Sequence, residues 1–147
     1  MKEIAMRVAG FVGAARLGLA LAASVAVPGT LAAEAGLSGY QGAWLMPGPS
    51  CEDVYSSAGK GTSFKKPVDI FAPAFIVSGN RLRTPMASCR IKSVRPTNDR
   101  QLLVLDCATA VAADEVRVLM ATLPDGSLRR YFNDQDTTGT SYQRCSR

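Results

Sequence analysis

Short apolar runs separated by polar turns fill most of the chain after residue 69, and their spacing predicts antiparallel β-strands. Runs rich in Val, Ile, Leu and Phe cover residues 70–77, 81–94, 115–123 and 127–133, and a polar or glycine-containing turn follows each one. Such runs, bounded by Gly, Pro, Asn and Asp, are typical of a meander. The sequence therefore predicts an all-β fold, a small antiparallel meander or a half-closed barrel.

A hairpin is predicted around the turn residues 96–99, Pro-Thr-Asn-Asp, where proline presets φ and Asn and Asp tolerate left-handed conformations. A loop at residues 97–99 sets three cross-strand partners: Cys89 with Cys107, Ile91 with Leu105, and Ser93 with Leu103. One face of this hairpin is then apolar and suited to a core.

Four cysteines follow the N-terminal segment, and four cysteines allow three pairings. Opposed β-carbons of an antiparallel pair lie about 4.5 to 5.5 Å apart, close to the span of a disulfide. We therefore expect Cys89 to pair with Cys107, which leaves Cys51 to close a loop of about 95 residues with Cys145. A register slip of one residue would favour a crossed pairing instead.

Three segments are less settled. Residues 109–123 could form a helix, but Val116, Val118 and Met120 alternate with period two, which favours a strand. Residues 51–61 resemble a short helical turn that ends in glycine. The two prolines Pro73 and Pro85 are expected at sheet edges or bulges.

The N-terminus carries the features of a signal peptide, expected to form a signal helix. Three basic residues precede an apolar core of about eleven residues, and small residues follow, so we expect cleavage after residue 33 or 35. This leaves a single small β-domain, residues 36–147, that is periplasmic or secreted and has no stable membrane span after cleavage. The alternative is a retained anchor helix.

Charge and composition disfavour several function classes. Without residues 1–33 the chain keeps a net charge of about +3, too weak and too scattered to predict nucleic-acid binding. The sequence has no histidine, and its cysteines lack close zinc-ligand spacing, so we expect no metal, no cofactor and no enzyme. The acidic pairs Glu52-Asp53 and Asp114-Glu115 would point to opposite faces of a strand, which does not form a carboxylate dyad. The Asp136-Thr137-Thr138-Gly139 segment has one residue more than an aspartic-protease motif and is expected to be a surface loop.

Gly42-Ala43-Trp44 resembles the G-x-W motif of lipocalin-like barrels and of the small periplasmic protease inhibitors built on a similar barrel. That resemblance covers three residues and implies that Trp44 plugs one end of a barrel. Because Pro47 and Pro49 follow closely, the first strand must be short, and we count about seven strands. The alternative is a tryptophan packed on one side of an open sheet.

A basic cluster follows the two central strands, and four of its residues are the candidate surface for an anionic partner: Arg81, Arg83, Arg90 and Lys92. Strand alternation places each pair on one face. The partner would be a protein or an anionic envelope component. The alternative is an ordinary charged face that keeps a sheet soluble.

These features together predict a non-enzymatic binding protein, inhibitor-like and monomeric, that presents loops on a sheet held by two disulfides. A second hypothesis is a carrier of a small apolar ligand inside a barrel, which five apolar residues motivate: Trp44, Phe71, Phe75, Ile76 and Met120. Further alternatives are a structural envelope protein that contacts an anionic surface, and an enzyme that uses only Asp, Glu, Ser or Lys.

Overall fold

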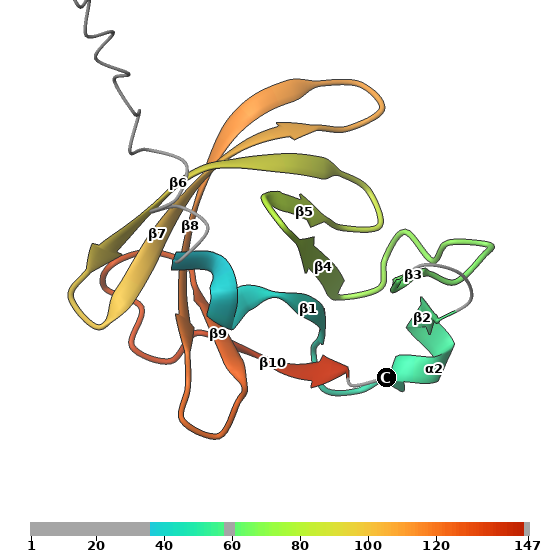
Figure 1. The fold of residues 1–147 in the computed structure, drawn as a ribbon, viewed down its shortest axis with the longest axis horizontal. Coiled ribbons are helices and arrows are strands. Elements are labelled where there is room, and N and C mark those ends of the chain that lie inside the picture. The colour runs from blue at the N-terminus through green and yellow to red at the C-terminus, as the bar shows by residue number, and fades with distance from the viewer. Residues whose placement is uncertain (1–35, 58–60, 146–147) are drawn as a thin grey trace, which may run out of the picture.

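Eight strands of the chain close into an antiparallel barrel in the computed structural model, which describes residues 36–57 and 61–145 (Figure 1). The predicted signal peptide lies outside these residues. Around the barrel the order is β1-β10-β9-β8-β7-β6-β5-β4, and β1 closes it by pairing with both β10 and β4. The barrel strands are β1 (Gly42–Leu45), β4 (Ala74–Ser78), β5 (Arg81–Arg83), β6 (Ser88–Thr97), β7 (Arg100–Ala108), β8 (Ala113–Thr122), β9 (Leu128–Tyr131) and β10 (Thr140–Cys145).

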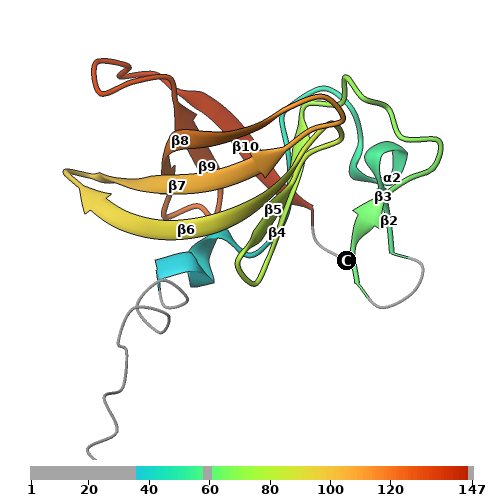
Figure 2. The ribbon, with the colours of Figure 1, turned by 90° about the horizontal axis from the view of Figure 1, so that it is seen from above.

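A small unit lies beside the barrel, at the right in Figures 1 and 2. It consists of the helix α2 (Cys51–Val54) and the two-stranded ribbon of β2 (Tyr55–Ser56) and β3 (Ser63–Phe64). The predicted helical turn therefore forms, but it passes into β2 rather than ending at glycine. The unit packs on the outer face of β1 and β4, where a second apolar core forms from Ala43, Leu45, Val54, Tyr55, Ala74 and Ile76.

The all-β, antiparallel fold agrees with the sequence prediction, and the sheet closes fully with one strand more than the seven counted. The additional strand arises because residues 81–94 do not form one strand. A turn separates β5 from β6, held by a hydrogen bond of 2.9 Å from the Thr84 amide to the Ala87 carbonyl. Pro85 lies inside this turn, and Pro73 directly precedes β4, so neither proline occupies an edge strand or a bulge.

The central hairpin has the predicted partners next to the disulfide but not near its turn. Cys89 lies opposite Cys107 and Ile91 opposite Leu105, as expected, whereas Ser93 pairs with Val104 instead of Leu103. The turn is one residue shorter than predicted, with only residues 98 and 99 outside the ladder, and a register shift between residues 91 and 93 compensates for it. The two differences cancel, so the cysteines still face each other.

Both expected disulfides are present. Cys89 is joined to Cys107 across β6 and β7 with their Cα atoms 4.0 Å apart, and Cys51 is joined to Cys145 with a Cα separation of 5.7 Å. The second bond fastens the start of α2 to the end of β10 over a sequence separation of 94 residues. Two disulfides are consistent with an oxidising, extracytoplasmic compartment.

The ambiguous segment 109–123 contains the strand β8, residues 113–122, rather than a helix. β8 pairs with β7 from Ala113 to Met120 and then with β9 as far as Thr122. Asp125 and Gly126 lie in the tight connection to β9, where Gly126 has a φ of +82° that favours glycine. The period-two pattern and the Asp-Gly turn therefore predicted the local structure correctly.

Candidate ligand cavity and charged surfaces

One end of the barrel is closed by a tryptophan and a short 3-10 helix, η1 (Ser38–Tyr40). Trp44 is fully buried, and its indole N–H donates to the Tyr40 carbonyl at 2.8 Å. The Arg144 guanidinium lies 4.5 Å from the centroid of the Trp44 ring and donates to the carbonyls of Gln41 (2.6 Å) and Gly39 (3.0 Å). Trp44 thus fills this end of the barrel. The resemblance of Gly42-Ala43-Trp44 to the motif of lipocalin-like barrels stays a prediction.

Position 42, the first of the G-x-W motif, requires glycine because of its backbone conformation and its close neighbour Arg144. Its φ is +117°, and a Cβ at this position would lie 3.3 Å from an Arg144 guanidinium nitrogen. Any other residue would be strained in its backbone and would crowd the arginine that covers Trp44.

The other end of the barrel is hollow. A cavity of about 440 Å³ opens there, bounded by the barrel interior, the β5–β6 turn, the start of the β7–β8 connection and the segment before β4. Its lining is almost entirely apolar: Ile70, Ala72, Pro73, Ala74, Phe75, Leu82, Thr84, Pro85, Met86, Ala87, Cys89, Leu105, Cys107, Thr109, Val116, Val118, Met120, Arg130 and Tyr142. This volume lies within the range of small-molecule sites, which are about 300 to 1,000 Å³.

The carrier hypothesis named five residues, and two of them line the cavity. Phe75 and Met120 form part of its wall. Trp44 belongs to the closed end, Ile76 packs in the second core on the outside of the barrel, and Phe71 is 83% exposed on the loop before β4.

Arg130 is a cavity residue that the sequence analysis missed. It lies opposite Met120 on β8 and opposite Thr140 on β10, and it lines the cavity. The available signal was the alternation after the Asp-Gly turn: Leu128 faces the interior, so Arg130, two residues later, faces the same side.

The four residues of the predicted anionic-partner surface lie on neighbouring strands β5 and β6. Arg81 lies directly opposite Arg90, and Arg83 opposite Ser88, while Lys92 follows along β6. Arg81, Arg90 and Lys92 are exposed, and Arg83 is half-buried because it donates to the Thr62 carbonyl at 3.2 Å.

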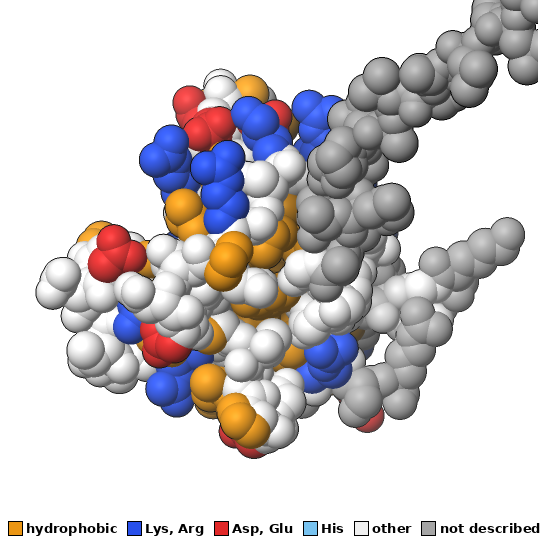
Figure 3. All heavy atoms as spheres, turned by 60° about the vertical axis from the view of Figure 1, so that its left-hand side comes forward, with side chains coloured by type: hydrophobic (Ala, Val, Ile, Leu, Met, Phe, Trp, Pro, Cys, Tyr) orange, Lys and Arg blue, Asp and Glu red, His pale blue; other side chains and the backbone are white. Residues whose placement is uncertain are grey.

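Acidic residues on β7 and β8 partly neutralise this surface. Lys92 lies 3.0 Å from Glu115 and 3.5 Å from Asp106, and Arg90 lies 3.5 Å from Asp106. The hydrogen bond that Lys92 donates to Glu115, together with the charge of Asp106, raises the pKa of the Lys92 ammonium group. Figure 3 shows the resulting mixture, with basic side chains crowded at the top of the molecule and acidic ones among them.

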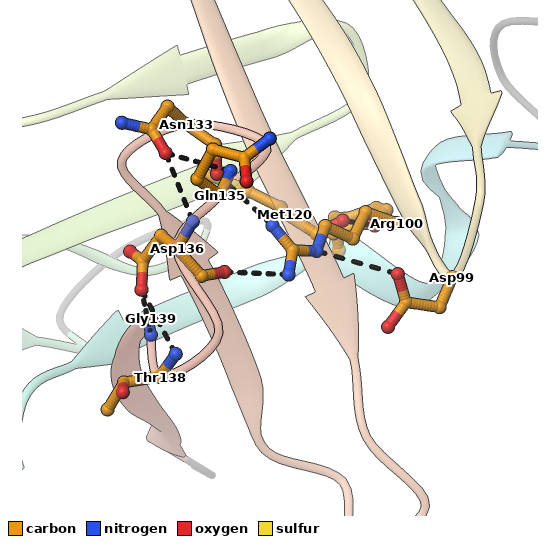
Figure 4. A network of polar contacts seen from close by, with 9 residues as sticks. Asp99, Arg100, Met120, Asn133, Gln135, Asp136, Thr138 and Gly139 are labelled. Carbon is orange, nitrogen blue, oxygen red and sulfur yellow. Dashed lines mark hydrogen bonds and ion pairs between the residues drawn. The ribbon is translucent and has the colours of Figure 1, made fainter.

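The segment 136–139 is a structural loop, as expected. The Asp136 carboxylate accepts from the backbone N–H groups of Phe132, Thr138 and Gly139, and these hydrogen bonds, that from Phe132 first, lower the pKa of this carboxyl group. Figure 4 shows how Arg100 ties the loop to the barrel, donating to the Asn133 carbonyl at 3.2 Å and the Asp136 carbonyl at 2.7 Å. The Asp136 carboxylate is therefore engaged by backbone N–H groups. In the network of Figure 4, no second carboxylate bonds to it.

The acidic pairs form no dyad. Glu52 and Asp53 lie in the exposed first turn of α2 rather than on a strand, and Glu115 of the second pair is engaged by Lys92. Within residues 36–57 and 61–145, no group of three His, Cys, Asp or Glu side chains could hold a metal ion. No helix in this part of the chain has the length and apolarity needed to cross a membrane.

Comparison with known proteins found no matching family model, no matching curated protein and no matching solved structure.

Proposed function

We propose that this protein is an exported, non-enzymatic binding protein that holds a small apolar ligand in the open end of its barrel. The observation that carries the proposal is the cavity of about 440 Å³ at the end of the barrel opposite Trp44. Protein interiors are otherwise close-packed, and apolar cavities that stay dry accept apolar guests. Of the binding functions predicted from the sequence, the carrier therefore has the stronger support.

Export is supported by two features. The N-terminal sequence has the pattern of a signal peptide, and all four cysteines form disulfides, which persist in the periplasm or outside the cell. A ligand that is poorly soluble in water would need a carrier in such a compartment. The proposed role is to enclose this ligand rather than to transform it.

A fluorescent probe and two matched variants test the proposal. The neutral apolar dye N-phenyl-1-naphthylamine should increase in fluorescence on binding the oxidised protein. Val116→Trp places a large ring in the cavity wall at a residue that is 37% exposed, so it should abolish the increase without unfolding the barrel. Val111→Trp, at a residue that is 94% exposed and does not line the cavity, should bind the dye as the wild type does.

Equal dye binding by the Val116→Trp and Val111→Trp variants would place the site elsewhere and refute the proposal. Absence of binding to the wild type, measured with protein whose native fold is verified by circular dichroism, would refute it as well.

The anionic-partner surface is a second candidate function, favoured by one observation. Arg81 and Arg90 are direct cross-strand neighbours, and like charges directly opposite each other are destabilising. Asp106 offsets the charge of Arg90, whereas no acidic residue in the described part of the chain pairs with Arg81. Replacing Arg90 and Lys92 together by Ser should weaken binding to vesicles that contain phosphatidylglycerol and leave the melting temperature unchanged, since exposed ion pairs contribute little. A large fall in melting temperature would show that the pair supports the fold instead.

A further inference from the structure

Arg130 is the one charged side chain among the described residues that line the cavity. Its neighbours across the ladder, Met120 and Thr140, carry no charge. Arg130 is nevertheless exposed to solvent, so its guanidinium group lies where the cavity opens to water. This position allows Arg130 to bind the anionic group of a partner whose apolar part enters the cavity.

The described part of the chain provides no such partner. Other arginines make contacts: Arg100 lies over the Tyr131 ring at 3.7 Å, and Arg144 covers Trp44. No ion pair, hydrogen bond or ring contact engages the Arg130 guanidinium group in residues 36–57 and 61–145. A carboxylate on the same face of β8, that of Asp114, is six residues from Met120, or about 20 Å along the strand.

Tyr142 contributes a second polar side chain to the same wall of the cavity. Tyr142 lies opposite Leu128, so Arg130 and Tyr142 are diagonal neighbours on the inner face of β9 and β10, and both line the cavity. The Tyr142 ring packs edge-on against Phe75, with 5.0 Å between centroids, which fixes its orientation. Its hydroxyl group makes no hydrogen bond to any residue in the described part of the chain.

We infer that the ligand is an amphipathic carboxylate, whose acid group binds Arg130 and Tyr142 while its apolar body fills the cavity. This inference rests on the proposed function. A guanidinium group presents paired N–H donors that match a carboxylate, and a tyrosine hydroxyl adds a third donor. The apolar body would contact Val118, Met120 and Leu105, deeper in the barrel.

Two ligands that differ only in the head group test the inference: decanoate and 1-decanol, titrated calorimetrically at neutral pH. The wild type should bind decanoate at least tenfold more tightly than 1-decanol, because hydrogen bonds to charged groups are worth more than neutral ones. Arg130→Gln should remove this preference by weakening decanoate binding about tenfold while changing 1-decanol binding less than twofold. Arg95→Gln, which removes an equal charge from an exposed residue of β6 outside the cavity, should bind both ligands as the wild type does.

The outcomes separate the inference from the proposed function. Equal binding of decanoate and 1-decanol by the wild type, or equal weakening of both by Arg130→Gln, would overturn the carboxylate inference and leave the apolar cavity in place. Binding of neither ligand, together with failure of the dye to bind, would overturn the proposed function itself.

Discussion

Removing the disulfide between Cys51 and Cys145 should destabilise the protein mainly through its unfolded state. The bond closes a sequence separation of 94 residues, against 18 for the bond between Cys89 and Cys107. With the chain-entropy relation, a loop of 94 residues corresponds to about 4.7 kcal/mol at 25 °C and one of 18 residues to about 3.2 kcal/mol. Because a small domain is stable by about 5 to 15 kcal/mol, the double variant C51A/C145A should lose a large part of that margin.

The folded state has other contacts that hold the same segment in place. The Tyr55 hydroxyl donates to the carbonyls of Trp44 at 2.6 Å and Phe75 at 3.1 Å, and Val54 is buried with Tyr55 in the second core against β1 and β4. The unit of α2, β2 and β3 should therefore stay on the barrel without the disulfide. Most of the lost free energy then comes from the greater freedom of the unfolded chain.

Urea denaturation measures both effects. C51A/C145A should lower the free energy of unfolding by about 4 to 5 kcal/mol and increase the m-value, because a chain without the long loop exposes more surface when it unfolds. Dye binding by the folded variant should equal that of the wild type, since neither cysteine lines the main cavity. A loss below about 2 kcal/mol at an unchanged m-value would refute this reasoning.

Three further predictions concern particular residues. Arg100→Met should cost about 2 to 4 kcal/mol in urea denaturation, because it removes the contact with the Tyr131 ring and two hydrogen bonds from a side chain that is 12% exposed; a loss below 1 kcal/mol would contradict this. Burial raises the pKa of Tyr40 to about 12, so its contribution to stability is complete below pH 10 and is lost as the pH rises from 10 through 12. Tyr40→Phe should flatten this alkaline decline in thermal denaturation; an unchanged decline would mean that other groups cause it. Gly139→Ala should lower the melting temperature more than Gly126→Ala, since both have positive φ but only at Gly139 would the new Cβ meet a side-chain carbon at 2.6 Å; equal effects would show that backbone strain alone matters.

Local patterns along the chain were sufficient to predict the antiparallel all-β fold, the central hairpin and both disulfides. Turn chemistry and period-two alternation determine which residues pair, and the apolar face of the central hairpin identified the side that is buried. The predicted register near residues 93–99 was wrong, because the residue types there do not distinguish a two-residue turn with a bulge from a three-residue turn without one. The division of residues 81–94 into β5 and β6 was missed for a similar reason: Thr84 and Ala87 bond each other across a turn, and Pro85 alone did not reveal it.

The cavity could not be predicted from the sequence, because the same apolar side chains can fill a barrel or line a hollow one. Composition counts these residues but does not place them. Phe75 and Met120 were identified as carrier residues on apolarity alone, and the same reasoning included Ile76, which lies on the outer face. Arg130 was overlooked because it is exposed like most strand arginines, and its place at the cavity follows only from its register with Met120.

Because the barrel has a packed end and a hollow end, the disulfides also matter for its stability. Side chains around a cavity lack contacts on one side, so the hollow end contributes less to stability than a filled core of equal size. The packed end compensates in part, with Trp44, Leu103 and Leu128 completely buried, and the disulfides add stability without filling the cavity. Because the bond between Cys89 and Cys107 lies in the cavity wall itself, it also fixes the spacing of β6 and β7 at the entrance. A barrel stabilised by covalent bonds can therefore keep an empty, shaped cavity, as a ligand carrier requires.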